Sequence, residues 1–495
     1  MSNPVATPIA LPIYGLNTRE DQDDIPRGYS RSMVNAERRG TAVVKAKGKL
    51  KINSSAALAG AVVQGGIDYQ TAGGIRIEII HGAGQISRMQ GATETVLETF
   101  GAPTAIIRGE VFMGQLYLTN GVDVVKITDG NTISLLPDAP QGKLIHLYND
   151  HLFIANVPDD TNGPSKLYNS ALRDPTSWSS VNVYNLDTNN AEEITALFTL
   201  RGYLGVAKND SISFLRGNFF DALSDSFDAV RLPVETGIGI VSQGTCVKDD
   251  SGNLYYLNEG GFYQLSSPGA APRLISGAIS GTVNAINFGV AHLFTAVQMQ
   301  AMDEIWWCVA VNGSATPNMI LRYSMRYPTP GSVGAWWPLN LANVRSIWGF
   351  ENGTDTQQIR GGDNAGYTYN MNTTYYDNTG SYDSFFVMDN VRHRAGGYGA
   401  WDWLITRIDN AGNWNVNIEL YPGGIRNSPH VVSTSTVATD DSDPTFFNRQ
   451  TVERQIRIAG VTANTLGIKV YNNTGGQNYG MHELAAMVRP LGMFR

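Results

Sequence analysis

The sequence predicts an all-β protein, built from a β-propeller of six or seven blades and a C-terminal β-sandwich. Three observations lead to this prediction: 53 of the 495 residues are glycine, 10% are aromatic and only 16% are charged. Disordered chains and coiled coils need more charge and fewer aromatic residues. Short apolar runs bounded by Gly, Asn and Asp recur along the chain, and this pattern is typical of strands joined by tight turns.

Residues 1–58 are expected to form an extended segment that leads into the propeller. Between Arg19 and Lys51, nine basic residues stand against five acidic ones, in a chain whose net charge is −8. Alternating lysines would share one face of a strand. We therefore treat this segment as a candidate docking face for a partner protein, and its candidate residues are Arg38, Arg39, Lys45, Lys47, Lys49 and Lys51. An equally good interpretation is an edge strand that its lysines protect from aggregation.

Residues 59–378 are expected to form the propeller, because a strand core of the type Leu-Tyr-x-x-Asn returns at near-constant intervals. The anchors of successive copies are Leu116, Leu152, Leu204, Leu254, Ile305 and Ile359, spaced 36, 52, 50, 51 and 54 residues apart, after a weaker copy at residues 75–80. A period near fifty residues with about four short strands is the size of a propeller blade. The alternative is a series of β-sandwiches whose hairpins happen to repeat. Short helices are expected only near residues 221–230 and 280–300.

Residues 379–495 are expected to form the sandwich, because the repeat ends and alternating apolar segments follow. Six or seven such segments fit within about 115 residues, which suits a compact β-sandwich. The stretch from Ser433 to Pro444, rich in Ser, Thr and Asp, is expected to be an exposed crossover.

Motifs of enzymes and metal sites are absent from the sequence. There is no His-Glu-x-x-His, Cys-x-x-Cys or Gly-x-Ser-x-Gly, and the seven histidines are scattered. We therefore expect no catalytic residues, no cofactor and no metal. Acidic pairs such as Asp159-Asp160, Asp249-Asp250 and Asp440-Asp441 lie in turn-like stretches, where solvated turns are expected and calcium is the alternative. Cys246 and Cys308 are expected to be buried free thiols.

The overall charge and hydropathy limit the classes of partner. No run of eighteen apolar residues occurs, so no membrane-spanning helix is expected, and no signal peptide is visible at the N-terminus. A chain of net charge −8 is not expected to coat nucleic acid, since that affinity comes from Lys and Arg displacing counterions.

Several stretches resemble the N-terminal segment and a late propeller blade of tail hub or nozzle proteins of short-tailed bacteriophages. They are Tyr14-Gly15-Leu16-Asn17, Asp24 to Tyr29, Met33 to Ala36, Val43 to Gly48, Gly239 to Ser242, and Asn253 to Tyr263. The basic strand lacks the Arg-Pro-Gly of that pattern, so no subfamily is assigned.

The resemblance implies a non-enzymatic virion protein, made in the host cytoplasm, that forms a ring, usually six-fold. The ring would continue the DNA channel below the head-to-tail adaptor proteins, help to retain the genome, and let double-stranded DNA pass during ejection. Tail fibres or spikes are further candidate partners. An acidic wall suits such a conduit, because it would not hold phosphates tightly, and abundant aromatic residues suit large subunit contacts. The alternative is a propeller that binds or cleaves carbohydrates.

Overall fold

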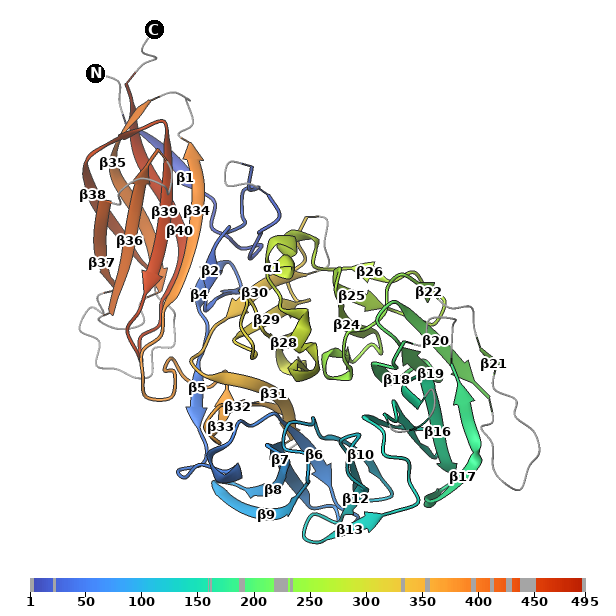
Figure 1. Ribbon diagram of the computed structural model, residues 1–495. Coiled ribbons are helices and arrows are strands. Elements are labelled where there is room, and N and C mark those ends of the chain that lie inside the picture. The colour runs from blue at the N-terminus through green and yellow to red at the C-terminus, as the bar shows by residue number, and fades with distance from the viewer. Residues whose placement is uncertain are drawn as a thin grey trace.

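The computed structural model shows a round propeller with an upright sandwich beside it (Figure 1). It describes all residues except 1–3, 21–23, 159, 161–162, 187–191, 218–229, 232–234, 331–333, 352–356, 393–397, 410–413, 424–429, 437–450 and 492–495. The expected helix at residues 221–230 and most of the expected crossover at Ser433 to Pro444 therefore lie outside the described residues.

The described residues form seven antiparallel blades, within the six or seven expected. Blade 1 consists of β6 (Gly65–Gln70), β7 (Arg76–Gly82), β8 (Gln85–Gln90) and β9 (Thr93–Thr99), and blade 2 of β10 (Arg108–Phe112), β11 (Gln115–Thr119), β12 (Val125–Thr128) and β13 (Ile133–Leu136). Blade 3 consists of β14 (Leu144–Tyr148), β15 (His151–Ala155), β16 (Lys166–Ala171) and β17 (Asp174–Asn185). Blade 4 consists of β18 (Ala196–Leu200), β19 (Tyr203–Ala207) and β20 (Ser211–Arg216), and both β21 (Val230–Arg231) and β22 (Glu235–Thr236) pair with β20. Blade 5 consists of β23 (Val247–Lys248), β24 (Leu254–Asn258), β25 (Gly261–Leu265) and β26 (Arg273–Leu274). Blade 6 consists of β27 (Thr295–Met299), β28 (Glu304–Val309), β29 (Met319–Ser324) and β30 (Ala335–Leu339). Blade 7 consists of β31 (Val344–Glu351), β32 (Gln357–Asp363), β33 (Thr368–Met371) and β5 (Lys49–Lys51).

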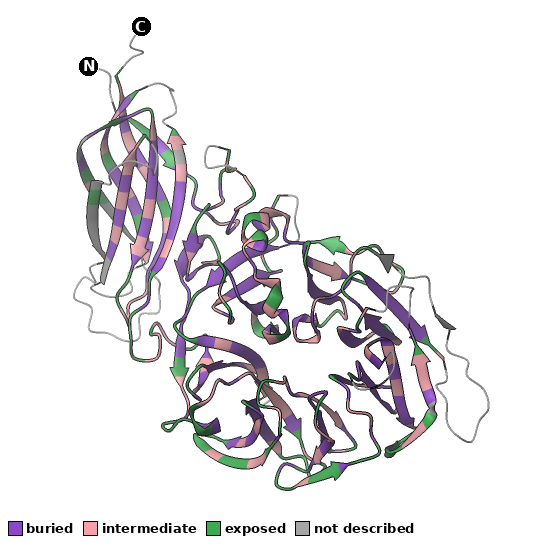
Figure 2. Ribbon diagram, in the orientation of Figure 1, coloured by how far each residue is buried: buried purple, intermediate pink, exposed green. Residues whose placement is uncertain are grey.

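The repeat anchors all lie at one position of the blade, its second strand. Leu116, Leu152, Leu204, Leu254, Ile305 and Ile359 are on β11, β15, β19, β24, β28 and β32, and all six side chains are buried. A second strand is covered by neighbouring blades on both faces, so it needs apolar residues without strict alternation. Figure 2 shows this as purple strands in the blade interiors and more green toward the outer strands. The repeat interpretation is therefore confirmed.

The ring of blades is closed by a strand from the far end of the sequence. β5 pairs with β33, with Lys51 opposite Tyr369 and Lys49 opposite Met371. The last blade thus takes its outermost strand from the segment that precedes the first blade. This closure ties the two ends of the propeller together.

The sandwich consists of two sheets, and four of its strands come from the N-terminal segment. One sheet has the order β3 (Ala36–Arg39), β4 (Ala42–Lys45), β40 (Gly480–Pro490), β35 (Gly399–Asp409) and β38 (Thr451–Ala463), with β1 (Val5–Ile9) on β40. The other has the order β2 (Met33–Val34), β34 (Ser384–Arg392), β39 (Thr465–Asn472), β36 (Trp414–Pro422) and β37 (His430–Thr436).

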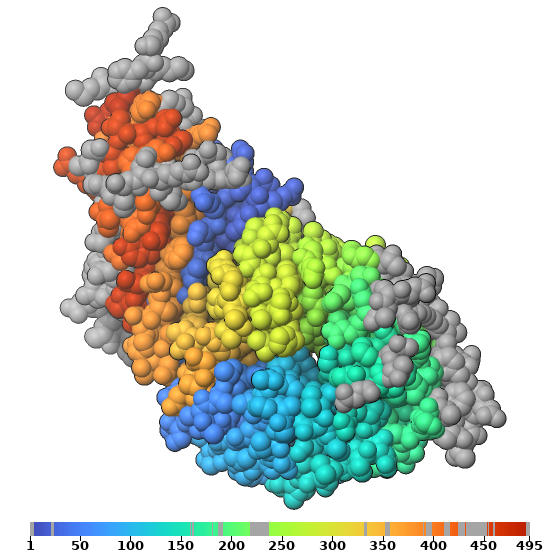
Figure 3. All heavy atoms as spheres, viewed as in Figure 1, coloured from blue at the N-terminus to red at the C-terminus, as the bar shows by residue number. Residues whose placement is uncertain are grey.

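This arrangement differs from the expectation for residues 1–58. The segment does not merely lead into the propeller: β1 to β4 belong to the sandwich and β5 belongs to blade 7. The chain crosses from one domain to the other after β4, and Figure 3 shows the N-terminal segment in blue filling the space between sandwich and propeller. One apolar cluster runs from the sandwich through this segment into blades 5 and 6, and it includes Phe386, Leu16, Trp336 and Trp307. β37 was also not expected, because its Ser and Thr residues suggested a loop.

Helices are few, as predicted. The described residues hold one α-helix, α1 (Ser280–Asn284), and short 3-10 turns that include η3 (Gln243–Thr245) and η5 (Phe288–Leu293). α1 and η5 fall in the expected stretch near residues 280–300, between blades 5 and 6. No helix in the described ranges is long and apolar enough to cross a bilayer.

Candidate functional site

The alternating lysines are divided between two domains. Lys45 ends β4 in the sandwich, and Lys49 and Lys51 lie on β5 in the propeller. Lys45 is fully buried: its Nζ donates to Asn472 Oδ1 at 3.0 Å and to the Thr474 carbonyl at 2.9 Å. Burial lowers the pKa of Lys45 to about 8, although Asp383 acts in the opposite direction. The expectation of one shared basic face is therefore wrong.

Lys49 is also buried and cannot face a partner. Its Nζ lies 3.3 Å from Asp377 Oδ1 and 4.1 Å from the centre of the Tyr369 ring. Lys51 stacks over the Tyr367 ring at 4.1 Å and stays partly exposed. β5 is the outer strand of its blade, so the interpretation as a lysine-bearing edge strand fits this part of the segment better than a docking face.

The remaining docking candidates are partly exposed. Arg38 lies over the Tyr327 ring at 4.5 Å, and Arg39 donates to Glu37 Oε1 through Nε and Nη2. Lys47 lies between β4 and β5, where the chain passes from the sandwich to the propeller. Of the six candidate docking residues, Arg38, Arg39, Lys47 and Lys51 are partly exposed and stay candidates, whereas Lys45 and Lys49 are buried.

The cysteines and the Asp249-Asp250 pair are largely as expected. Both cysteines are free; Cys308 is buried and Cys246 is partly buried, and burial raises the pKa of each thiol to about 12. Asp249 accepts from the backbone N–H and the side chain of Asn253, so this pair lies in a turn. Asp159, Asp440, Asp441 and His393 lie outside the described residues. Within the described ranges, no three His, Cys, Asp or Glu side chains gather as metal ligands.

Three residues of the N-terminal stretches that resemble phage hub proteins, Gly15, Leu16 and Asn35, lie at the joint between the two domains. Gly15 has φ +83°, and a Cβ there would come within 2.5 Å of the Trp336 carbonyl oxygen of blade 6. The Leu16 N–H donates to that same oxygen at 3.0 Å. Asn35 donates from Nδ2 to the Asp383 carbonyl before β34 and accepts at Oδ1 from the N–H of Asn340 after β30. The N-terminal segment is thus bonded to both domains at once.

A buried ion pair reinforces this joint. Arg322 on β29 of blade 6 has no exposed side-chain area, and its Nη1 lies 2.6 Å from Glu37 Oε2 on β3 of the sandwich. Arg322 also donates from Nε to the Trp337 carbonyl at 3.3 Å. A charged pair that is fully enclosed is costly to break, because the remaining charge has no access to water.

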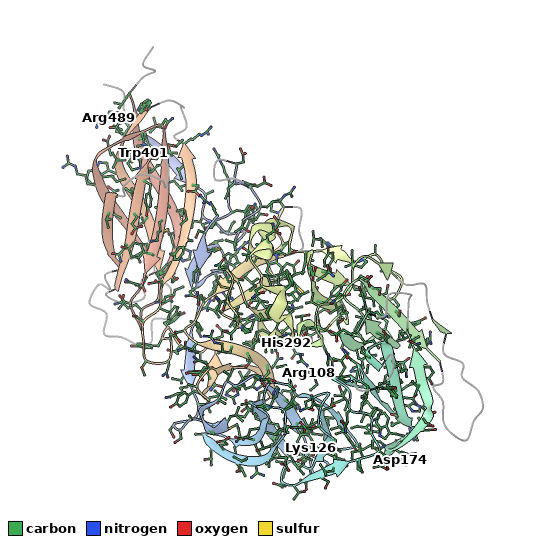
Figure 4. The ribbon with its side chains drawn as sticks, viewed as in Figure 1. Arg108, Lys126, Asp174, His292, Trp401 and Arg489 are labelled. Atoms are coloured by element: carbon green, nitrogen blue, oxygen red, sulfur yellow. The ribbon has the colours of Figure 1, made fainter. Side chains whose placement is uncertain are left out.

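A pocket of about 400 Å³ opens at one end of the propeller axis. Arg108, the first residue of β10 in blade 2, reaches across the axis to the segments before blades 5 and 6. Its Nη2 donates to the His292 carbonyl at 3.3 Å, and a Cβ on Gly244 would lie 3.0 Å from the same nitrogen. Figure 4 labels Arg108 and His292 next to each other at the middle of the propeller. Lys143 and Glu193, 2.9 Å apart, line the same pocket.

The electrostatics of this pocket are set by burial. Burial lowers the pKa of Arg108 to about 10, so the guanidinium is still charged at neutral pH. Burial, together with Arg108 and Lys143, lowers the pKa of His292, so the imidazole is neutral there. Arg108 forms no ion pair with any carboxylate of the described residues.

A polar chain links the innermost strands of blades 2, 3 and 4. His146 on β14 lies 3.4 Å from Glu110 on β10 through Nδ1, and its Nε2 is 2.8 Å from the Thr199 hydroxyl on β18. No motif in the sequence indicates this series of polar contacts or the Arg108 pocket. The partners are far apart in the sequence and meet only because the blades close into a ring.

No protein-family model and no curated protein sequence matches this chain. Among solved structures, it is similar to the extracellular domain of a protein described as a hybrid two-component system of B. thetaiotaomicron, with 12% identity and a TM-score of 0.42 over 78% of this chain and 47% of that one. It is also similar to PorZ of the type-IX secretion system of Porphyromonas gingivalis, with 11% identity and a TM-score of 0.40 over 64% of this chain and 38% of that one.

A third similar structure is an exo-β-1,3-galactanase from Phanerochaete chrysosporium, with 11% identity and a TM-score of 0.25 over 86% of this chain and 99% of that one. The chain spans less than half the length of the first two proteins. With TM-scores below 0.5, none of these similarities supports an argument about activity.

Proposed function

We propose that this protein is the tail hub or nozzle subunit of a short-tailed bacteriophage. Several copies, usually six, would form a ring that extends the DNA channel below the head-to-tail adaptor. The ring would help to retain the packaged genome and let it pass during ejection. In this proposal the protein is a structural component of the virion, made in the host cytoplasm, and has no catalytic activity.

The observation that carries the proposal is the joint between the domains. Gly15, Leu16 and Asn35 belong to the stretches that resemble hub proteins, and their contacts hold the sandwich against blade 6. A ring subunit contacts its neighbours through two different faces, and the ring closes only if the angle between those faces is fixed. A joint made by the N-terminal segment and sealed by the Glu37–Arg322 pair suits that requirement.

The proposed DNA path lies between subunits and not along the propeller axis. Arg108 spans that axis, and the pocket beside it has a volume of only about 400 Å³. Duplex DNA could not pass through it without unfolding the blades. The channel would therefore be enclosed by several copies.

Light scattering of the purified full-length protein during size-exclusion chromatography tests the proposal. We expect a mass several times the 53.7 kDa of one chain, with six copies as the usual number. A strict monomer at all concentrations, with glycan binding or cleavage, would contradict it.

Docking to the adaptor ring is a separate part of the proposal. Charge reversal by Lys47→Glu together with Lys51→Glu should weaken adaptor binding and reduce its salt dependence. Arg173→Glu is the control, because Arg173 is 74% exposed and lies in blade 3, far along the chain from the docking residues. Unchanged binding by the double variant would show that this segment does not dock.

A second candidate function is a glycan-binding propeller. The observation that favours it is the axis pocket, whose volume falls within the usual range for small-ligand sites. Among the described residues that line it, however, none is Phe, Tyr or Trp, the side chains on which sugar rings commonly stack. A glycan array on the wild-type protein separates the two candidates, since a hub ring requires no glycan ligand.

A further inference from the structure

The strongest unexplained feature of the molecule is the charge at the end of the propeller axis. Arg108 belongs to an innermost strand, is partly exposed, and reaches toward segments of the opposite blades near the middle of the propeller, where Figure 4 labels it beside His292. A guanidinium forms its strongest hydrogen bonds with anionic oxygens. Within the described residues, Arg108 donates from Nη2 to a neutral carbonyl oxygen, that of His292.

The two buried arginines of the described residues, Arg322 and Arg360, have carboxylate partners. Arg322 pairs with Glu37 at 2.6 Å, and Arg360 lies 3.5 Å from Glu78. Arg108 differs from both, since it is partly exposed and forms no ion pair with a carboxylate of the described residues. Among the described residues that line the pocket, Glu193 is the one carboxylate, and it accepts from Lys143 and from Asn156.

The walls of the pocket are largely apolar. Ile106, Val122, Leu144, Ile194 and Val241 line it, alongside the polar groups already described. With Lys143 balanced by Glu193, the lining carries one net positive charge, from Arg108. Such a lining matches a ligand with one negative charge and an apolar body better than it matches a dianion.

We propose that the axis pocket binds a small monocarboxylate, whose carboxylate pairs with the Arg108 guanidinium and whose apolar part contacts Ile106, Leu144 and Ile194. Gly244 provides the space for the guanidinium, because a Cβ there would lie within 3.2 Å of both terminal nitrogens. The carboxylate would accept from guanidinium N–H groups, forming charge-assisted hydrogen bonds that are stronger than neutral ones. This proposal concerns a single chain and does not depend on ring assembly.

Calorimetric titration of the full-length protein tests the proposal, with sodium benzoate as the probe at constant ionic strength. Benzyl alcohol is the uncharged comparison, and inorganic phosphate is the comparison with higher charge. We expect benzoate to bind the wild type, and to bind more tightly than either comparison. Equal binding of benzoate and benzyl alcohol, tighter binding of phosphate, or no heat with benzoate would overturn the proposal.

Two pairs of variants test the role of charge. Arg108→Gln should weaken benzoate binding at least tenfold, whereas the control Arg173→Gln should leave it unchanged. If Arg108 is only a structural tie across the axis, Arg108→Gln will lower thermal stability but leave the benzoate affinity unchanged, and the proposal fails.

The second pair does not depend on whether Arg108→Gln folds. Val122 lines the pocket and is 55% exposed, so substitutions there should not disturb the core. Val122→Glu should weaken benzoate binding severalfold by repelling the carboxylate, and Val122→Gln, of equal size, should not. Equal affinities for these two variants would also overturn the proposal.

Discussion

Replacing Glu37 by Gln should destabilise the joint between the sandwich and the propeller by about 3 kcal/mol. The carboxylate of Glu37 is shared between two arginines: Oε2 lies 2.6 Å from Arg322 Nη1, and Oε1 lies 2.6 Å from Arg39 Nη2. The amide would keep the shape of the side chain but remove its charge. Arg322, which has no exposed area, would then be a buried cation without its counter-ion.

The magnitude follows from the surroundings of Arg322. Removing one member of a buried pair costs about 3–5 kcal/mol. We expect the lower end, because Glu304 on the adjacent strand β28 also faces Arg322 and because the Trp306 ring lies 5.4 Å from its guanidinium. Arg39 adds little to the cost, since its side chain is 33% exposed and can be rehydrated.

Urea unfolding followed by tryptophan fluorescence measures this effect. The control is Asp150→Asn, which breaks the pair with Arg173, whose members are 48% and 74% exposed and which should contribute less than about 1 kcal/mol. The double variant Glu37→Leu with Arg322→Met should recover most of the loss, because neither charge of the pair remains buried and because burial, which raises the pKa of Glu304, favours the neutral form of that carboxyl. If Glu37→Gln and Asp150→Asn lower the midpoint equally, the reasoning about the joint is wrong.

Three further predictions concern other parts of the fold. Gly15→Ala should cost at least about 2 kcal/mol more than Gly40→Ala in urea unfolding, because both residues have positive φ but only a Cβ at Gly15 meets backbone, at 2.5 Å. Burial, together with the nearby charge of Arg108, lowers the pKa of His81 from 6.5 to about 3. Below pH 6.5 the unfolded chain therefore binds a proton that the folded chain does not. The stability that is present above pH 6.5 is lost as the pH falls toward 3. His81→Gln should thus reduce the loss of stability between pH 7 and pH 5 by about 2 kcal/mol in unfolding titrations, and an unchanged pH profile would count against this assignment. Deleting residues 1–51 removes β5 from blade 7 and β1 to β4 from the sandwich. Thermal unfolding followed by circular dichroism should then lose its cooperativity. If the truncated chain unfolds as cooperatively as the intact one, the propeller does not need β5 for closure.

The propeller could be predicted because its repeat reflects a local requirement. Each second strand needs an apolar run of about five residues, and that run is visible in the sequence at Leu116, Leu254 and Ile305. The blade count also followed, since the weak first copy at residues 75–80 coincides with β7. Such apolar runs can be recognised in the sequence because each second strand contains one within its own few residues.

The division of the N-terminal segment could not be predicted from the same patterns. Lys45 and Lys49 alternate as residues of one strand would, yet the chain passes between domains at Ala46 to Gly48. Burial of both lysines is possible because Asp377 forms an ion pair with Lys49, and because Asn472 and the Thr474 carbonyl accept hydrogen bonds from Lys45. These partners lie more than three hundred residues away in the sequence, so a local periodicity cannot predict them.

The Arg108 pocket was missed for a related reason. Arg108 stands in an ordinary strand, and nothing beside it in the sequence distinguishes it from other arginines. Its special position arises only when blade 2 faces blades 5 and 6 across the closed ring. The sequence could have identified Arg108 as a pocket residue only if the innermost strand of each blade had been known.

Electron microscopy of the purified full-length protein tests the central proposal most directly. We expect closed rings in which several copies surround a channel wide enough for duplex DNA, with each propeller axis lying off that channel. Single propellers that never associate, or rings whose only opening is the axis of one propeller, would contradict it.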